Sequence, residues 1–206
     1  EDPVVGGHTP DRIALRRAIN LAQDMDTEIR TIRRGQAIPA QSPVSPNLYG
    51  YDPAFKSENS TYDPARAKAL LDMYGYVDRD GDGWRDLPDG KPLVIVRSTQ
   101  PEQVNREFGT LWKKNLDAIG IKTTFNVGKW AEQLKSARAG KLQVWSLSSS
   151  AADPDGQGAF QRFHGPQAGS QNLARFRNAE LDAKVAERTQ ALRGSVALWR
   201  ADWLFA

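Results

Sequence analysis

The chain has 206 residues, 39% apolar and 26% charged, so it is long enough for a sizeable core and has an ordinary globular composition. Its formal net charge of +3 is small and the charges are interspersed, which gives no indication of a nucleic-acid partner. The lack of cysteine excludes disulfides, thiolate zinc sites and thiol nucleophiles, and two histidines argue against a multi-histidine metal site.

Residues 1–8 are rich in turn formers, and we expect them to be a linker or hinge. They contain no initiator Met, basic region or apolar signal region, so we expect the chain to be a piece of a longer protein. No later stretch approaches the ~20 apolar residues of a membrane span.

Two helices are predicted next. Thr9 before Pro10 is typical of a helix start, and apolar residues then recur at helical spacing as far as Met25. Asp26 is the expected cap of a second helix, which Gly35 ends. Residues 36–62 contain four prolines and are predicted to be a long loop, either a functional lid or an extended arm on the surface.

The middle of the chain alternates helices and strands. Asp63 before Pro64 predicts a third helix that stops at Gly75. Beyond an acidic loop come strand 93–96, helix 101–119, strand 121–127, helix 130–139 and strand 142–147. This order predicts an α/β layer with parallel strand pairing. Further on, we expect a short helix at 158–163, a last helix from Asn178 to about Leu192, and a Trp- and Leu-rich tail at 195–206 that the pattern does not place.

The acidic loop has the spacing of a calcium ligand set. Asp78, Asp80 and Asp82 alternate and Gly83 follows, which matches the first half of an EF-hand loop. The further ligands would be the Trp84 carbonyl, Asp86 through water, and Asp89 at position twelve. An EF-hand has Glu at position twelve and a helix after it, whereas this loop has Asp and a strand. The pattern therefore leaves two interpretations open: a structural calcium site, or a solvated turn whose carboxylates cap its own amides.

Small polar residues follow the strand at 142–147, where ligands usually bind in open α/β sheets. They could offer hydroxyls and carboxylates from Ser146, Ser148, Ser149, Ser150, Asp153 and Asp155. The alternative is that D-P-D-G at 153–156 is simply a turn. No G-x-S-x-G elbow, Walker loop or Rossmann glycine motif is present, and His164 is expected at the surface or in packing. We therefore expect no enzyme; a hydrolase built on Asp153, Asp155 and His164 is the least favoured hypothesis.

Several segments together resemble the family 5 solute-binding proteins, the peptide, nickel and oligopeptide receptors of ABC importers. The segments are R-I-A-L-R-R-A-I-N-L-A-Q-D at 12–24, I-R-T-I-R-R-G-Q-A-I-P-A-Q-S-P-V-S-P at 29–46, Y-D-P-A-R-A-K-A-L-L at 62–71, D-R-D-G-D-G-W-R-D at 78–86, L-W-K-K-N-L-D-A-I-G-I-K at 111–122, A-A-D-P-D-G at 151–156 and N-L-A-R-F-R-N-A-E-L-D at 172–182.

The resemblance implies an α/β, periplasmic-binding-protein-like lobe with a central mixed sheet flanked by helices. Residues 9–194 would be the second lobe of a hinge-closing receptor in the periplasm or outside the cytoplasm. Its partners would be a peptide-like or other small solute, the first lobe of the same protein, and ABC permease subunits, with no required cofactor and calcium as an optional structural ion. The implied solute contacts lie at 148–155, at Gln41 and Ser42 of the proline-rich loop, and at Arg175.

One position departs from the family pattern. Many peptide-binding members carry an Asp three residues before the D-P pair, where it meets the peptide ammonium, and here that position is Ser150. A hydroxyl cannot supply that charge pairing, so we expect a different solute, or an amine held by Asp153 or Asp155. The alternative function is a calcium-stabilised secreted interaction or adhesion domain.

Overall fold

The computed structural model describes residues 2–148, 150, 157–187 and 190. The chain divides into two compact units. The sheet unit comprises Glu1–Ser42, Ala54–Ala137 and Lys141–Ser148, and the second unit comprises Pro43–Pro53, Arg138–Gly140 and Ser149–Ala206. Every helix within the described residues is too short or too polar to cross a lipid bilayer.

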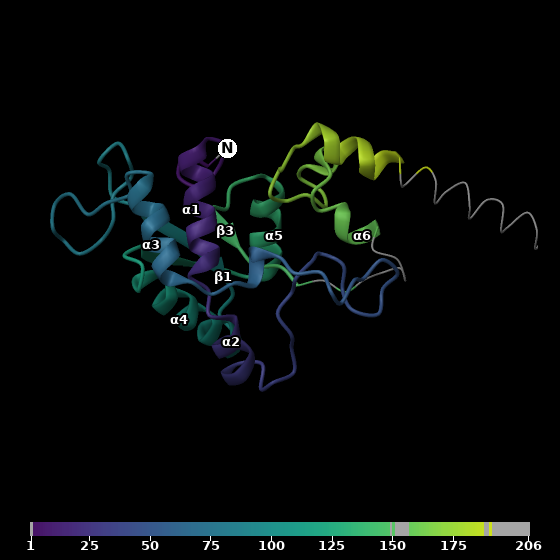
Figure 1. The fold of residues 1–206 in the computed structure, drawn as a ribbon, viewed down its shortest axis with the longest axis horizontal. Helices are drawn as coiled ribbons and strands as arrows, with labels where there is room; N and C mark the ends of the chain where they lie inside the picture. Colours follow the sequence, from purple (N-terminus) through teal and green to yellow (C-terminus); the bar gives the residue numbers. More distant parts are fainter. Residues whose placement is uncertain (1, 149, 151–156, 188–189, 191–206) are drawn as a thin grey trace, which may run out of the picture. The chain divides into compact units, whose positions relative to one another are not determined.

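The three early helices of the sheet unit begin at short polar caps. Helix α1 (Pro10–Leu21) follows Thr9, as predicted. Helix α3 (Pro64–Met73) is capped by Asp63, whose carboxylate accepts a hydrogen bond from the Arg66 amide at 2.8 Å. Helices α1 and α3 pack against each other (Figure 1).

The predicted start of the second helix is wrong by two residues. Helix α2 (Met25–Thr31) is capped by Asp24 and not by Asp26. Asp24 accepts hydrogen bonds from both the amide and the hydroxyl of Thr27, at 2.9 and 2.7 Å. Asp24 therefore satisfies the first turn of α2 through Thr27.

The sheet has three strands, all parallel, which confirms the α/β prediction. The mixed sheet that the resemblance implies is not found among the described strands. In chain order the elements are β1 (Val94–Thr99), α4 (Gln103–Asp117), β2 (Lys122–Val127), α5 (Trp130–Arg138) and β3 (Val144–Trp145). The spatial order is β2-β1-β3, with β1 paired on both sides. Right-handed crossovers in this order place α4 and α5 on opposite faces of the sheet.

Strand β3 is shorter than the predicted 142–147 because a side chain replaces part of its ladder. The Gln143 side-chain oxygen accepts a hydrogen bond from the Val96 amide of β1 at 2.6 Å. The Gln143 side-chain nitrogen donates to the Asp2 carboxylate at 3.3 Å. Gln143 thus ties the predicted hinge segment to the central strand.

The core of the sheet unit joins helices α1, α3 and α4 to strand β1. Its fully buried large side chains are Tyr76, Leu15, Leu71, Leu93, Ile95, Leu116, Ile119 and Ile121. Ile95 alternates with exposed Val96, so the odd-numbered face of β1 points to this core. Arg97 and Thr99 share that face by the same alternation.

The second unit is built around short elements and one buried amide. It contains α6 (Gln157–Phe160), η2 (Gly165–Gln167) and helical residues 179–187, capped by Asn178 as predicted. Asn172 is fully buried, donates to the carbonyls of His164 and Phe176, and accepts from the Phe176 amide. The predicted tail at 195–206 lies outside the described residues.

Replacing Leu71 by alanine should lower the free energy of unfolding by about 2–5 kcal/mol, because its buried side chain would leave a cavity in the core. Met73 lies on the same helix with 76% of its surface exposed, so Met73→Ala is the matched control, with an expected change of less than about 0.5 kcal/mol. Urea unfolding of the 206-residue chain measures both. Equal losses for the two variants would contradict the assigned core.

Stability should also fall at alkaline pH through Tyr76. Burial raises the pKa of its phenol to about 12 from the usual 10.0, with a smaller contribution from Asp11. Its contribution to stability is complete below pH 10 and is lost as the pH rises from 10 to 12, where the unfolded phenol ionises first. Tyr76→Phe should remove that part of the loss in urea unfolding at pH 9 and 11, whereas Tyr49→Phe at an exposed tyrosine should keep it. Parallel curves for wild type and Tyr76→Phe would contradict this.

Candidate functional site

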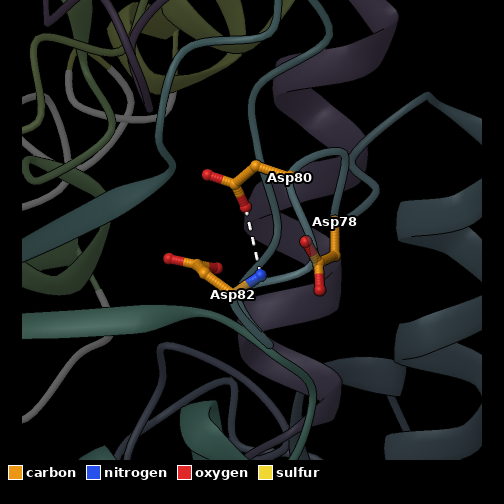
Figure 2. A group of neighbouring side chains, drawn as sticks. All are labelled: Asp78, Asp80 and Asp82. Carbon is orange, nitrogen blue, oxygen red and sulfur yellow. Dashed lines mark hydrogen bonds between the residues drawn. The ribbon is translucent and has the colours of Figure 1, made fainter.

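The acidic loop brings three predicted metal ligands together. Carboxylate oxygens of Asp78, Asp80 and Asp82 all lie within 4.8 Å of one another, and all three side chains are exposed (Figure 2). Their spacing at every second residue of a turning backbone produces this convergence, as the sequence predicted. Hard oxygen ligands of this kind suit calcium.

The same three carboxylates also cap the amides of their own loop. Asp78 accepts hydrogen bonds from the amides of Gly81 and Gly83 at 2.7 and 2.9 Å. Asp80 accepts from the Asp82 amide at 3.2 Å, and Asp82 from the Trp84 amide at 2.8 Å. These bonds are the ones the solvated-turn interpretation requires, and they are compatible with a calcium loop, so both interpretations remain.

Two further predicted metal ligands are engaged elsewhere. Asp86 is buried, and its carboxylate accepts a hydrogen bond from the Arg79 amide at 3.0 Å. Asp89 forms an ion pair with Lys91 at 2.6 Å, and this lysine holds the pKa of the Asp89 carboxyl below its usual value. Calcium binding by this loop stays a prediction.

The predicted solute contacts have different surroundings. In the sheet unit, the Gln41 side-chain oxygen accepts a hydrogen bond from the Ser57 amide at 2.9 Å, Ser42 is half-buried and Ser148 is exposed. In the second unit, Ser150 is exposed and Arg175 donates to the Arg138 carbonyl at 2.6 Å. Arg175 therefore has a structural partner, while Ser149, Asp153 and Asp155 lie outside the described residues.

A charged residue that the sequence analysis missed lies in the centre of the sheet. Arg97 occupies the carboxyl-terminal half of β1 and is only 9% exposed. Its guanidinium donates a hydrogen bond to the hydroxyl of exposed Ser146 at 3.2 Å and lies 4.8 Å from the ring centre of Trp112. Among the described residues it forms no ion pair.

Arg97 contrasts with Arg85, whose side chain is also largely buried, at 13% exposure. Arg85 donates to the carbonyls of Ile119 and Tyr76 at 2.7 and 2.5 Å and pairs with Asp72 at 2.5 Å. Arg85 is thus a satisfied structural residue, and Arg97 is a buried cation with spare donors.

Burial lowers the pKa of the Arg97 guanidinium, against a smaller opposing effect of Glu28. An arginine nevertheless stays protonated in a protein. A buried charge that lacks an ion pair within bonding distance is costly, and ligands bind at the carboxyl ends of parallel strands. Arg97 with Ser146 can therefore bind a carboxylate or a similar anion. The signal in the sequence was a single charge within the apolar run L-V-I-V-R-S-T at 93–99.

Comparisons with known proteins agree on one family. The model of the bacterial extracellular solute-binding proteins, family 5 Middle, matches residues 8–171. The chain is 29% identical over 185 residues to heme-binding protein A of Haemophilus influenzae, covering 86% of this chain and 31% of that protein. It is 32% identical over 153 residues to di/tripeptide-binding protein 2 of Pseudomonas aeruginosa, covering 72% of this chain and 26% of that protein.

Solved structures show the same fold. The oligopeptide-binding protein AppA from Bacillus subtilis, in complex with a nonapeptide, matches with a TM-score of 0.76 at 23% identity, over 84% of this chain and 35% of that one. The chain therefore spans about a third or less of the length of these relatives. The comparisons support the solute-receptor hypothesis and not the adhesion-domain alternative.

Replacing Asp78 by alanine should lower the melting temperature by about 2–4 °C, the shift that about 1 kcal/mol produces in a domain of this size, because two backbone amides lose their acceptor. Asp80→Ala is the matched control, since it removes one longer bond and should shift the melting temperature less. If the loop binds calcium, 1 mM calcium should raise the wild-type melting temperature and Asp78→Ala should abolish that rise. An unchanged wild-type melting temperature in calcium and in chelator would reject the calcium interpretation.

Proposed function

Because this chain belongs to family 5 of the bacterial extracellular solute-binding proteins, we propose that it forms one lobe of a receptor that captures a small solute for an ABC importer. In this proposal the additional length of the relatives corresponds to the other wall of the cleft, and residues 1–8 belong to the hinge. Its partners are the solute, the first lobe and the membrane permease. The receptor works outside the cytoplasm, and capture by closure requires no catalysis.

The observation that carries the proposal is Arg97. A receptor lobe has to hold a polar solute in a site from which most water is excluded. A guanidinium fixed in such a site can bind an anionic group of the solute through charge-assisted hydrogen bonds. The Trp112 ring and the Ser146 hydroxyl fix the guanidinium while leaving donors for a ligand. We therefore assign the solute to molecules that present a carboxylate or a comparable anion.

The named ligands of the relatives are consistent with that class. The relatives are named for heme and for di- and tripeptides, and both kinds of molecule carry carboxylates. Ser150 stands where many peptide receptors carry an ammonium-binding carboxylate, and its side chain is exposed. In this proposal Arg97 and Ser146 therefore bind the anionic end of the solute.

The full-length receptor with Arg97→Gln should bind its solute at least ~30-fold more weakly than wild type, the effect of removing one partner of a buried, hydrogen-bonded charge pair worth ~2 kcal/mol or more. Calorimetry with di- and tripeptides, glutathione and dicarboxylates, each beside its amide, measures this. Wild type should prefer the acid over the amide, and Arg97→Gln should lose the preference.

Arg85→Gln is the matched control, because Arg85 is buried to a similar degree but bonded to carbonyls of the fold. This variant should lose stability and keep the acid preference, whereas Arg97→Gln should keep or gain stability. Equal binding of acid and amide by wild type, or unchanged binding by Arg97→Gln, would reject the assignment. Failure of the whole panel to bind would count against solute capture itself.

A further inference from the structure

A groove of about 370 Å³ lies on the α4 face of the sheet, at the carboxyl ends of β1 and β2. It is lined by Thr99, Gln100, Pro101, Asn105, Arg106, Gly109, Thr110, Phe125 and Val127. Small-molecule sites occupy roughly 300–1,000 Å³, so the groove is large enough for a small ligand. Arg97, Trp112 and Ser146 do not line it, although Arg97 is paired in register with Phe125, so the groove lies beside the assigned solute contact.

Helix α4 carries a glycine opposite an aromatic ring, and both residues line the groove. A Cβ at position 109 would lie 3.3 Å from Cε1 of Phe125, closer than ordinary van der Waals contact. Glycine inside a helix is less favourable than alanine by about 1 kcal/mol, and Gly109 is in the middle of 15-residue α4. The glycine therefore lets the Phe125 ring lie against the helix.

The floor of the groove is apolar and open to solvent. Thr123, Phe125 and Val127 share one face of β2, and their exposure rises along the strand from 6% to 37% to 59%. The side chains on this face of β2 are therefore buried near its amino end and exposed near its carboxyl end. Apolar and aromatic side chains in a hollow, with a few polar groups beside them, are the usual lining of a small-molecule site.

The charge of the groove has one sign. Arg106 is the single ionisable residue among those that line it. Its guanidinium donates to the carbonyl of Pro101, another lining residue, which holds the charge at the rim. The acidic neighbours Glu102 and Glu107 accept hydrogen bonds from Asn105 and Gln103 and do not line the groove.

We propose that this groove binds a small organic anion with a flat apolar body, such as an aryl carboxylate. The apolar body lies against Phe125 and Val127, and the carboxylate meets the guanidinium of Arg106. This site goes beyond the proposed function, because it neither uses Arg97 nor requires the rest of the receptor.

The test is an NMR titration of the 206-residue chain with 4-phenylbutyrate and, in parallel, with 4-phenyl-1-butanol. The acid should give saturable shifts centred on Gly109, Phe125 and Val127, and should bind about tenfold or more tightly than the alcohol, which corresponds to one charge-assisted contact. Arg106→Gln should reduce the affinity for the acid to that for the alcohol.

Val127→Asp places a negative charge in the groove and should abolish binding of the acid. Val104→Asp is the matched control, because Val104 is similarly exposed, lies on α4 and does not line the groove. Absence of shifts in the groove, equal affinity for acid and alcohol, or an unchanged Arg106→Gln would overturn the proposal. Shifts centred instead on Trp112 and Ser146 would assign the anion to Arg97, which rejects the groove and leaves the proposed function standing.

Discussion

Strand β1 is paired on both edges, and this fixes the rest of the sheet unit. Parallel neighbours hold its backbone in one register, so each of its side chains has one assigned face. Ile95 points into the core, and Arg97, two residues further on, has to share its face. The pairing that buries the apolar half of the strand therefore also buries the charge, under Trp112 of α4.

The contrast between two buried arginines separates structure from function in this lobe. Arg85 uses its donors on carbonyls that join the end of α4 to the loop before β1, so its burial stabilises the fold. Arg97 lies in a comparable environment with one hydroxyl and one aromatic ring as partners. Since a buried cation without an ion pair disfavours folding, we propose that a ligand beside the carboxyl ends of the strands supplies an anion to Arg97.

The acidic loop has a smaller part in this arrangement than its conspicuous sequence suggests. It connects α3 to β1, and three of its carboxylates hold the turn by accepting amides of the loop itself. Asp86 is buried, and its carboxylate accepts a hydrogen bond from the Arg79 amide. A bound ion would reinforce this connection, whereas the proposed solute contact lies on the strands that follow.

The sequence alone determined the elements whose causes are local. The Asp63 and Pro64 pair starts α3, Gly75 ends it, and the strand–helix order requires parallel pairing, because short connections leave a right-handed crossover as the available path. The family resemblance could be recognised from the sequence for the same reason, because it consists of local segments in a fixed order. Tertiary structure decided what depends on distant partners: that Gln143 cuts β3 short, that Arg175 is bound by a carbonyl, and that Arg97 is buried without an ion pair among the described residues. Burial and pairing bring together residues far apart in the chain, such as Arg97 and Ser146. Such contacts cannot be predicted from the periodicity of the sequence.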